Sequence, residues 1–163
     1  MLKKLKFIHI GHHKTGSTFI QNKVIPEIKI FKQPPAKKAN GETNQEFKQA
    51  WIDLVTQSDL NLNFKKIKKE LSKLDYNCLS NEAFVGYGAL ESGAGNLIKH
   101  TAQRLFELFG ETKILLVIRN QETWVKSSYL DSIEFGYSCN FKEWIERRKI
   151  HNQLDWCKYS KII

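Results

Sequence analysis

The residues with the clearest chemical potential follow the first hydrophobic run of the chain. Residues 8–18 read IHIGHHKTGST, so apolar residues lead directly into a glycine-bounded loop that holds two histidines, a lysine and several hydroxyl residues. Between a strand and a helix, such a loop lets consecutive backbone N–H groups converge on an anion. Ser17 and Thr18 can donate hydroxyl hydrogen bonds, and Lys14 adds a full positive charge. We therefore predict that this loop binds a phosphate group.

The loop differs from the Walker pattern of nucleoside triphosphatases in the place of its lysine. That pattern, G-x-x-x-x-G-K-[ST], puts the lysine directly after the second glycine. Here the glycines have the same spacing, but Ser17 follows the second glycine and Lys14 precedes it. A Walker enzyme also needs an aspartate at the end of a neighbouring strand to hold magnesium. The apolar run KILLVI, at 113–118, is followed instead by Arg119. We expect that a second phosphate is held there by side-chain charge and not through a metal.

A second candidate anion site begins at that arginine. The segment 119–131 reads RNQETWVKSSYLD, and Ser127 lies eight residues after Arg119 in a predicted helix. The helix can fold back so that the serine hydroxyl reaches the same anion as the guanidinium. Taken alone, the pair is explained as well by an arginine that caps a strand and a serine on a helix surface. The phosphate loop earlier in the chain favours the anion site.

Together the two segments resemble a known family. KTGST after one strand, and R-N-x-x-x-x-x-x-S after another, are similar to the two nucleotide motifs of sulfotransferases that use 3′-phosphoadenosine 5′-phosphosulfate (PAPS). The segment IHIGHHKTGSTFIQ resembles the bacterial and carbohydrate-type members of this family most. The resemblance implies that the 3′-phosphate is bound by Arg119 and Ser127. It implies that the 5′ side is bound by the first loop, that is, by His12, Lys14, Thr15, Gly16, Ser17 and Thr18.

The resemblance also implies a reaction. A sulfuryl group would pass from PAPS to an acceptor hydroxyl, with a carbohydrate as one candidate acceptor, and 3′-phosphoadenosine 5′-phosphate (PAP) would be released. Lys14 would stabilise the bridging oxygen as the S–O bond breaks. The general base stays open among three residues. Glu82 follows a predicted strand, and carbohydrate-type sulfotransferases use a glutamate in a comparable place, whereas His12 and His13 carry imidazoles that titrate near neutral pH.

The elements that must position these residues alternate along the chain. We predict strands at 5–10, 76–80 and 113–118. We predict helices at 18–25, 44–57, 64–74, about 97–109, 122–133 and 141–150. This alternation indicates an α/β protein with a parallel sheet covered by helices on both faces. The resemblance implies more narrowly a three-layer α/β/α, P-loop NTPase-like sulfotransferase fold. Ligands of such sheets bind at the carboxyl ends of strands, here 11–18, 81–82 and 119–128.

Several residues are expected to pack in the core or to terminate helices. Phe19, Ile20 and Val24 should lie on one side of the first helix, which Pro26 should limit. His9 alternates inside a strand and should be buried. Trp124, near Arg119, is the tryptophan best placed to stack on adenine or on a sugar acceptor. Core packing is nevertheless expected for all four tryptophans, which are Trp51, Trp124, Trp144 and Trp156.

The composition limits the partners and the location. The chain of 163 residues has 26 Lys+Arg against 17 Asp+Glu, a net charge of +9 that favours an anionic partner such as a nucleotide or an acidic polysaccharide. We expect no nucleic-acid partner, because no recognition motif accompanies the charge. We expect a cytoplasmic protein, since no apolar run approaches the roughly 20 residues of a membrane span and no secretory signal is evident. Cys78, Cys139 and Cys157 have no metal-like spacing and should be reduced thiols.

The domain organisation is predicted to be simple. We expect one sulfotransferase-like domain over 1–163, similar to the family mainly over about 5–25 and 113–135, without the C-terminal loop that closes over the adenine in that family. Two other functions remain open at this point. One is a P-loop kinase or other NTP-binding protein, and the other is a nucleotide-binding module without catalysis. The sequence gives no indication of the oligomeric state.

Overall fold

The computed structural model describes residues 2–11, 14–34, 64–85, 97–148, 150 and 161. Its strands are β1 (Phe7–Gly11), β2 (Cys78–Ser80) and β3 (Ile114–Val117). Its first helical segment runs through α1 (Ser17–Phe19), the π-helical turn η1 (Ile20–Val24) and α2 (Ile25–Glu27). The later helices are α4 (Phe64–Ser72), the 3-10 helix η2 (Glu82–Val85), α5 (Leu97–Phe109), α6 (Gln121–Glu134) and α7 (Phe141–Arg147). The helix predicted at 44–57, with Trp51, lies outside the described residues, as do Trp156 and Cys157.

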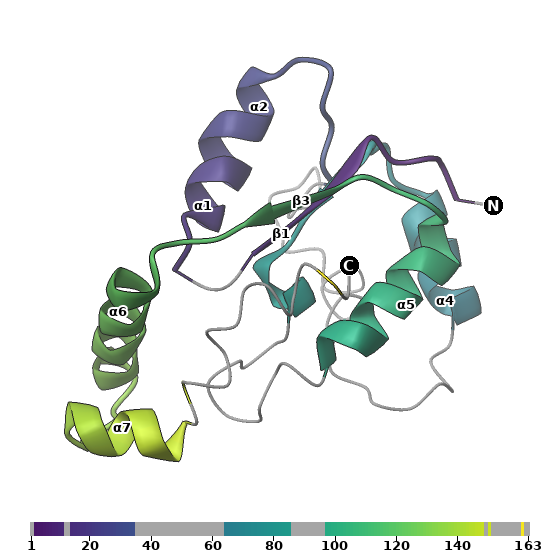
Figure 1. Cartoon of the computed structure of the whole chain (residues 1–163). Coiled ribbons are helices and arrows are strands. Elements are labelled where there is room, and N and C mark those ends of the chain that lie inside the picture. The colour runs from purple at the N-terminus through teal and green to yellow at the C-terminus, as the bar shows by residue number, and fades with distance from the viewer. Residues whose placement is uncertain are drawn as a thin grey trace.

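The three strands form a parallel sheet in the order β2-β1-β3 (Figure 1). In the register, His9 pairs with Ser80 on one side and with Leu115 on the other. This arrangement confirms the prediction of an α/β protein with a parallel sheet. Because β1 is central, the loop that follows it lies between the ends of the other two strands.

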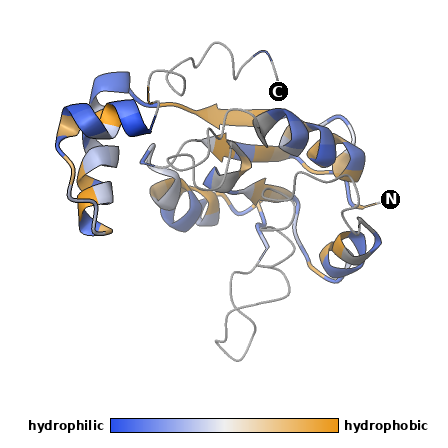
Figure 2. Cartoon of the chain, turned by 90° about the horizontal axis from the view of Figure 1, so that it is seen from below, coloured by the Kyte–Doolittle hydropathy of each residue, from blue (hydrophilic) through white to orange (hydrophobic). Residues whose placement is uncertain are grey.

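The larger core lies between one face of the sheet and the helices α4, α5 and η2. Ile8 and Ile10 of β1 point to this face because side chains alternate along a strand. They pack with apolar residues of the other elements, namely Leu5, Ile67, Leu71, Tyr76, Leu79, Phe84, Leu105, Leu108 and Phe109. In Figure 2 the strands are coloured mainly as hydrophobic, while the helices show both kinds of residue. We call the packed apolar side chains between the sheet and α4, α5 and η2 the sheet core. The helices predicted at 64–74 and 97–109 are confirmed, since they correspond to α4 and α5.

The helical segment α1–η1–α2 lies on the other side of the sheet from α4 and α5 (Figure 1). The predicted apolar side of this segment is wrong, because Phe19 is 64% exposed and Val24 is 37% exposed. The buried residues are Ser17 and Ile25 instead. The N–H of Ile25 donates to the carbonyl of Ile20, five residues earlier, so the turn is wider than in an α-helix and rotates the later residues. The helix also continues past Pro26, to Glu27.

Strand β3 is more exposed than its apolar sequence predicts. Leu115 is 45% exposed and Ile118, just after the strand, is 52% exposed. Among the described residues β3 pairs with β1 alone, so it lies at the edge of that sheet. A run of apolar residues therefore marks the strand correctly but does not report its burial.

Helices α6 and α7 form a hairpin with an apolar cluster of its own. Trp124 is 1% exposed and Trp144 is fully buried, and they pack with Val125 and Ile150. We call this group the hairpin cluster. Core packing is thus confirmed for both tryptophans, and the buried ring of Trp124 has no exposed face on which adenine or a sugar acceptor could stack. Helix α7 ends at Arg147, earlier than the predicted 150.

Both helices of the hairpin begin at an asparagine. The side-chain oxygen of Asn120 accepts a hydrogen bond from the N–H of Thr123, and that of Asn140 accepts one from the N–H of Glu143. These are N-cap bonds, which satisfy N–H groups that have no partner within the helix. The cap at Asn120 fixes the start of α6 directly after Arg119.

Candidate functional site

Three chain segments meet at the edge of the sheet where the strands end. The loop after β1, the residues Asn81 and Glu82 after β2, and Arg119 after β3 all follow carboxyl ends of parallel neighbours. Figure 1 shows α1 and α6 starting from this same end of β1 and β3. The N–H of Asn81 donates to the carbonyl of His9 at 3.1 Å, so the end of β2 is tied to β1. The fold therefore gathers the segments in which the sequence places its candidate residues.

The backbone of the first loop is tightly constrained. Lys14 has a φ of 64° and Gly16 a φ of 90°, both in the left-handed region. Lysine rarely adopts this conformation, so Lys14 is held in a strained position by its surroundings. At Gly11, a Cβ atom would lie 2.9 Å from the carbonyl oxygen of Val117 and 3.0 Å from Oγ1 of Thr15. Glycine at position 11 lets the loop pass directly against β3.

The hydroxyl residues of the loop face different surroundings. Ser17 is 1% exposed, and its Oγ lies 3.4 Å from Oγ1 of the half-buried Thr15. Thr18, by contrast, is exposed. The structure therefore brings Thr15 and Ser17 together at the base of the loop and turns Thr18 toward solvent. His12 and His13 lie outside the described residues.

Arg119 joins the end of β3 to the first loop. Its Nη1 donates to the carbonyl oxygen of Lys14 at 3.0 Å, and its Nε donates to Oγ1 of Thr123 at 3.2 Å. These two bonds hold the guanidinium beside the loop while using only part of its donor set. Sequence reasoning selected Arg119 but did not find Thr123. The spacing offers a signal, because Thr123 lies one helical turn after the arginine.

Lys14 itself pairs with a residue that the sequence did not single out. Its ammonium group forms an ion pair with the carboxylate of Asp131 on α6. Asp131 lies one turn after Ser127, and Ser127 lies one turn after Thr123, so the three share one side of the helix. Ser127 is half-buried. The hydroxyls of Thr123 and Ser127 and the carboxylate of Asp131 therefore lie in a row along α6. Thr123 contacts Arg119, and Asp131 contacts Lys14.

His9 of β1 pairs with Ser80, the last residue of β2, and Glu82 follows that strand. Glu82 is half-buried at the first position of η2. His9 is fully buried, as expected, with its Nδ1 2.6 Å from Oγ of Ser80. Burial lowers the pKa of His9, and the negative charge of Glu82 opposes that shift. The imidazole is therefore neutral at pH 7. Whether Glu82 or a histidine of the loop serves as general base stays a prediction.

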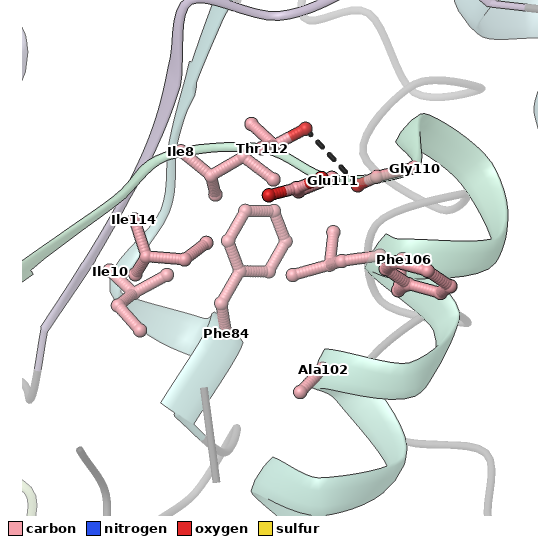
Figure 3. A pocket seen from close by; sticks show the side chains of 10 residues that line it. Ile8, Ile10, Phe84, Ala102, Phe106, Gly110, Glu111, Thr112 and Ile114 are labelled. Atoms are coloured by element: carbon pink, nitrogen blue, oxygen red, sulfur yellow. Dashed lines mark hydrogen bonds between the residues drawn. The ribbon is translucent and has the colours of Figure 1, made fainter. Parts of the chain in front are cut away.

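A pocket of about 240 Å³ lies elsewhere, between α5 and the face of β1 and β3 (Figure 3). Phe84 and Phe106 face it, and a hydrogen bond from Oγ1 of Thr112 to the carbonyl of Gly110, 3.3 Å long, lies at its margin. None of the candidate site residues lines it. The candidate site is therefore separate from this apolar pocket.

Two thiols lie outside the candidate site in the described part of the chain. Cys78 is buried and Cys139 half-buried, both as free thiols, and burial raises the pKa of Cys78. The described residues hold no group of three or more histidine, cysteine or acidic side chains that could bind a metal ion. Among the helices that the structure describes, none has the length and hydropathy of a membrane-spanning segment.

Comparisons with known proteins add no assignment. No protein-family model matches the chain, and no match was found among curated proteins or solved structures. The function is therefore inferred from the residues at the sheet edge.

Proposed function

We propose that this protein binds PAPS and transfers its sulfuryl group to an acceptor hydroxyl, with a carbohydrate as the candidate acceptor. The observation that supports it most directly is the hydrogen bond from Arg119 to the carbonyl of Lys14. The two motifs lie 105 residues apart in the sequence, yet this bond joins them. A nucleotide with phosphate groups at both the 3′ and the 5′ positions of its ribose needs two such cationic sites side by side.

The loop and α6 would divide the ligand between them. Backbone N–H groups of the loop, with the hydroxyls of Thr15, Ser17 and Thr18, would receive the 5′-phosphosulfate. Arg119 and Ser127 would receive the 3′-phosphate, because the guanidinium is exposed and Ser127 lies on the same side of α6 as Thr123, which the arginine contacts. Charge-assisted hydrogen bonds of this kind are the stronger ones in proteins.

The reaction would depend on position and electrostatics. The acceptor oxygen attacks sulfur in line, the bond from sulfur to the bridging oxygen breaks, and PAP leaves with the electron pair. Lys14 would stabilise the charge that grows on the bridging oxygen. Glu82 would take the acceptor proton, with His13 and His12 as the other candidates for that role.

Binding measurements separate this proposal from nucleoside triphosphate chemistry. In isothermal titration calorimetry we expect metal-independent binding of PAP that is tighter than binding of ATP with magnesium. A preference for ATP with magnesium would support the kinase or NTP-binding alternative instead and would refute the proposal.

Transfer measurements separate an enzyme from a binding module. With donor carrying labelled sulfate and a panel of hydroxyl acceptors, Lys14→Ala should abolish transfer, while the matched exposed lysine variant Lys23→Ala should retain it. Arg119→Ala should weaken PAP binding, and Arg147→Ala, which removes an exposed arginine of α7, should not. Binding of PAP without transfer to any acceptor would leave the non-catalytic module as the function.

A further inference from the structure

The ion pair between Lys14 and Asp131 places a carboxylate beside the loop that is proposed to hold an anion. The side chains are only partly exposed, Lys14 at 37% and Asp131 at 22%. The pair connects the strained residue of the loop after β1 with the third turn of α6. A negative charge at this point is unexpected for a phosphate site, because it repels the ligand.

The carbonyl and the ammonium group of Lys14 are both connected to α6 by the contacts around them. Its carbonyl accepts from Arg119, whose Nε is bound to Thr123 on the same helix. Its ammonium group reaches Asp131, two turns further along. The loop is therefore joined to α6 at two points, one through the backbone and one through the lysine side chain. Only the side-chain contact has to break for Lys14 to bind a ligand.

We propose that Asp131 is a positioning residue that competes with the donor anion for Lys14. Without ligand, the carboxylate keeps the ammonium group over the loop. When the anion binds, it takes the place of the carboxylate as the partner of Lys14. The inference rests on the proposed anion binding of the loop. It assigns to Asp131 a role that opposes ligand binding while keeping the lysine in place.

The expected size of the effect follows from the exposure of the pair. A partly exposed ion pair contributes modestly, so removing Asp131 should strengthen anion binding by about two- to fivefold. A residue that merely anchored the loop would have the opposite effect, since its loss would loosen the site and weaken binding. The sign of the change therefore distinguishes competition from a purely structural role.

The first measurement needs no nucleotide. Lys14 is labelled with an amine-reactive acylating reagent, and the rate is followed by peptide mass spectrometry in wild type and in Asp131→Asn. We expect Lys14 to react about two- to fivefold faster in the variant, because its ammonium group has lost its partner. Glu122→Gln is the matched control, since it removes one carboxylate from the same helix, where Glu122 pairs with Lys126. Equal labelling rates in all three proteins would overturn the inference.

The second measurement uses inorganic pyrophosphate, and then PAP, as ligands. Pyrophosphate should protect Lys14 from labelling at a two- to fivefold lower concentration in Asp131→Asn than in wild type or Glu122→Gln. PAP should show the same ratio by calorimetry. Unchanged or weaker pyrophosphate protection in Asp131→Asn would overturn the inference. If pyrophosphate behaves as expected but PAP does not bind, the nucleotide assignment fails while competition at Lys14 stands.

A second variant guards against a folding defect. Asp131→Ser removes the charge with a smaller side chain, and circular dichroism with thermal unfolding shows whether either variant keeps the fold. Both variants should show the same direction of change. Opposite directions in two folded variants would overturn the inference, because competition requires only the loss of the carboxylate.

Discussion

The sheet core and the hairpin cluster stabilise the protein in different ways. The sheet core is made of many medium-sized apolar side chains from five elements and the residues that flank the strands. The hairpin cluster depends on two tryptophans and a short series of hydrogen bonds. In that series, Nε1 of Trp144 donates to Oγ of Ser132 at 2.9 Å, and that hydroxyl donates to the carbonyl of Ser128 at 2.9 Å.

This difference bears on the candidate site, which takes residues from both regions. Lys14 follows β1 of the sheet, whereas Asp131 and Ser127 lie on α6 of the hairpin. Loss of one apolar group in the sheet core leaves many neighbours in place. Loss of a tryptophan removes much of what holds α6 and α7 together. We therefore expect the α6 side of the site to be the more easily disturbed.

The largest effect is expected for Trp144→Ala. Removing this fully buried ring should lower the free energy of unfolding by about 3–5 kcal/mol. Amide hydrogen exchange should show the loss of protection mainly in α6 and α7. Leu71→Ala in the sheet core is the comparison, and its loss of protection should centre on α4, β1 and β2. If Trp144→Ala reduced protection equally in the sheet, the two regions would form one cooperative unit and the contrast would be wrong.

Gly11→Ala tests the close approach of the loop to β3. The added methyl group would meet the carbonyl oxygen of Val117, which is backbone and cannot turn away. We expect a loss of about 1–3 kcal/mol in chemical denaturation, together with weaker PAP binding, because the loop must shift. Gly136→Ala cannot serve as the control, because Gly136 has a φ of 92° and an alanine there would strain the backbone for a different reason. A variant with wild-type stability and affinity would show that the loop adapts without cost.

Ser132→Ala tests the hydrogen-bond series of the hairpin. The variant leaves the indole N–H of Trp144 buried without its partner, which should cost about 1–3 kcal/mol in urea unfolding. Ser72→Ala is the control, because its hydroxyl donates to the carbonyl of Lys69 at an exposed position. We expect that control to stay within about 0.5 kcal/mol of wild type. Equal effects of the two changes would contradict the role given to Ser132.

The smallest effect concerns the pH dependence of the sheet region. Burial lowers the pKa of His9 below its ordinary value of 6.5, so the unfolded chain binds a proton that the folded protein does not. Stability from this source is present above pH 6.5 and declines as the pH falls below it, by no more than about 1.4 kcal/mol per pH unit for one proton. His9→Gln should remove this part of the decline between pH 7 and 5. His100→Gln, at an exposed position on α5, should leave it unchanged.

Local pattern predicted much of the secondary structure. The apolar runs at 5–10 and 113–118, the helix over 122–133 and the stop at Gly110 match β1, β3, α6 and the end of α5. The predictions of burial are wrong where the contacts with neighbouring elements determine which side chains are exposed. The π-turn before Pro26 rotates the side chains of the first helical segment, and β3 is exposed because it lies at an edge. Neither feature follows from the order of apolar residues in one segment.

The candidate site shows the same division. The sequence by itself determined which chemically active residues lie at the strand ends. Lys14, Glu82 and Arg119 each follow a run of strand-forming residues closely. Only the tertiary structure decided that Arg119 binds the carbonyl of Lys14 and that Asp131 pairs with its ammonium group. The physical reason is that the parallel pairing of β1 and β3 brings α6 beside the first loop. Local sequence encodes the elements, and their packing determines which distant charges meet.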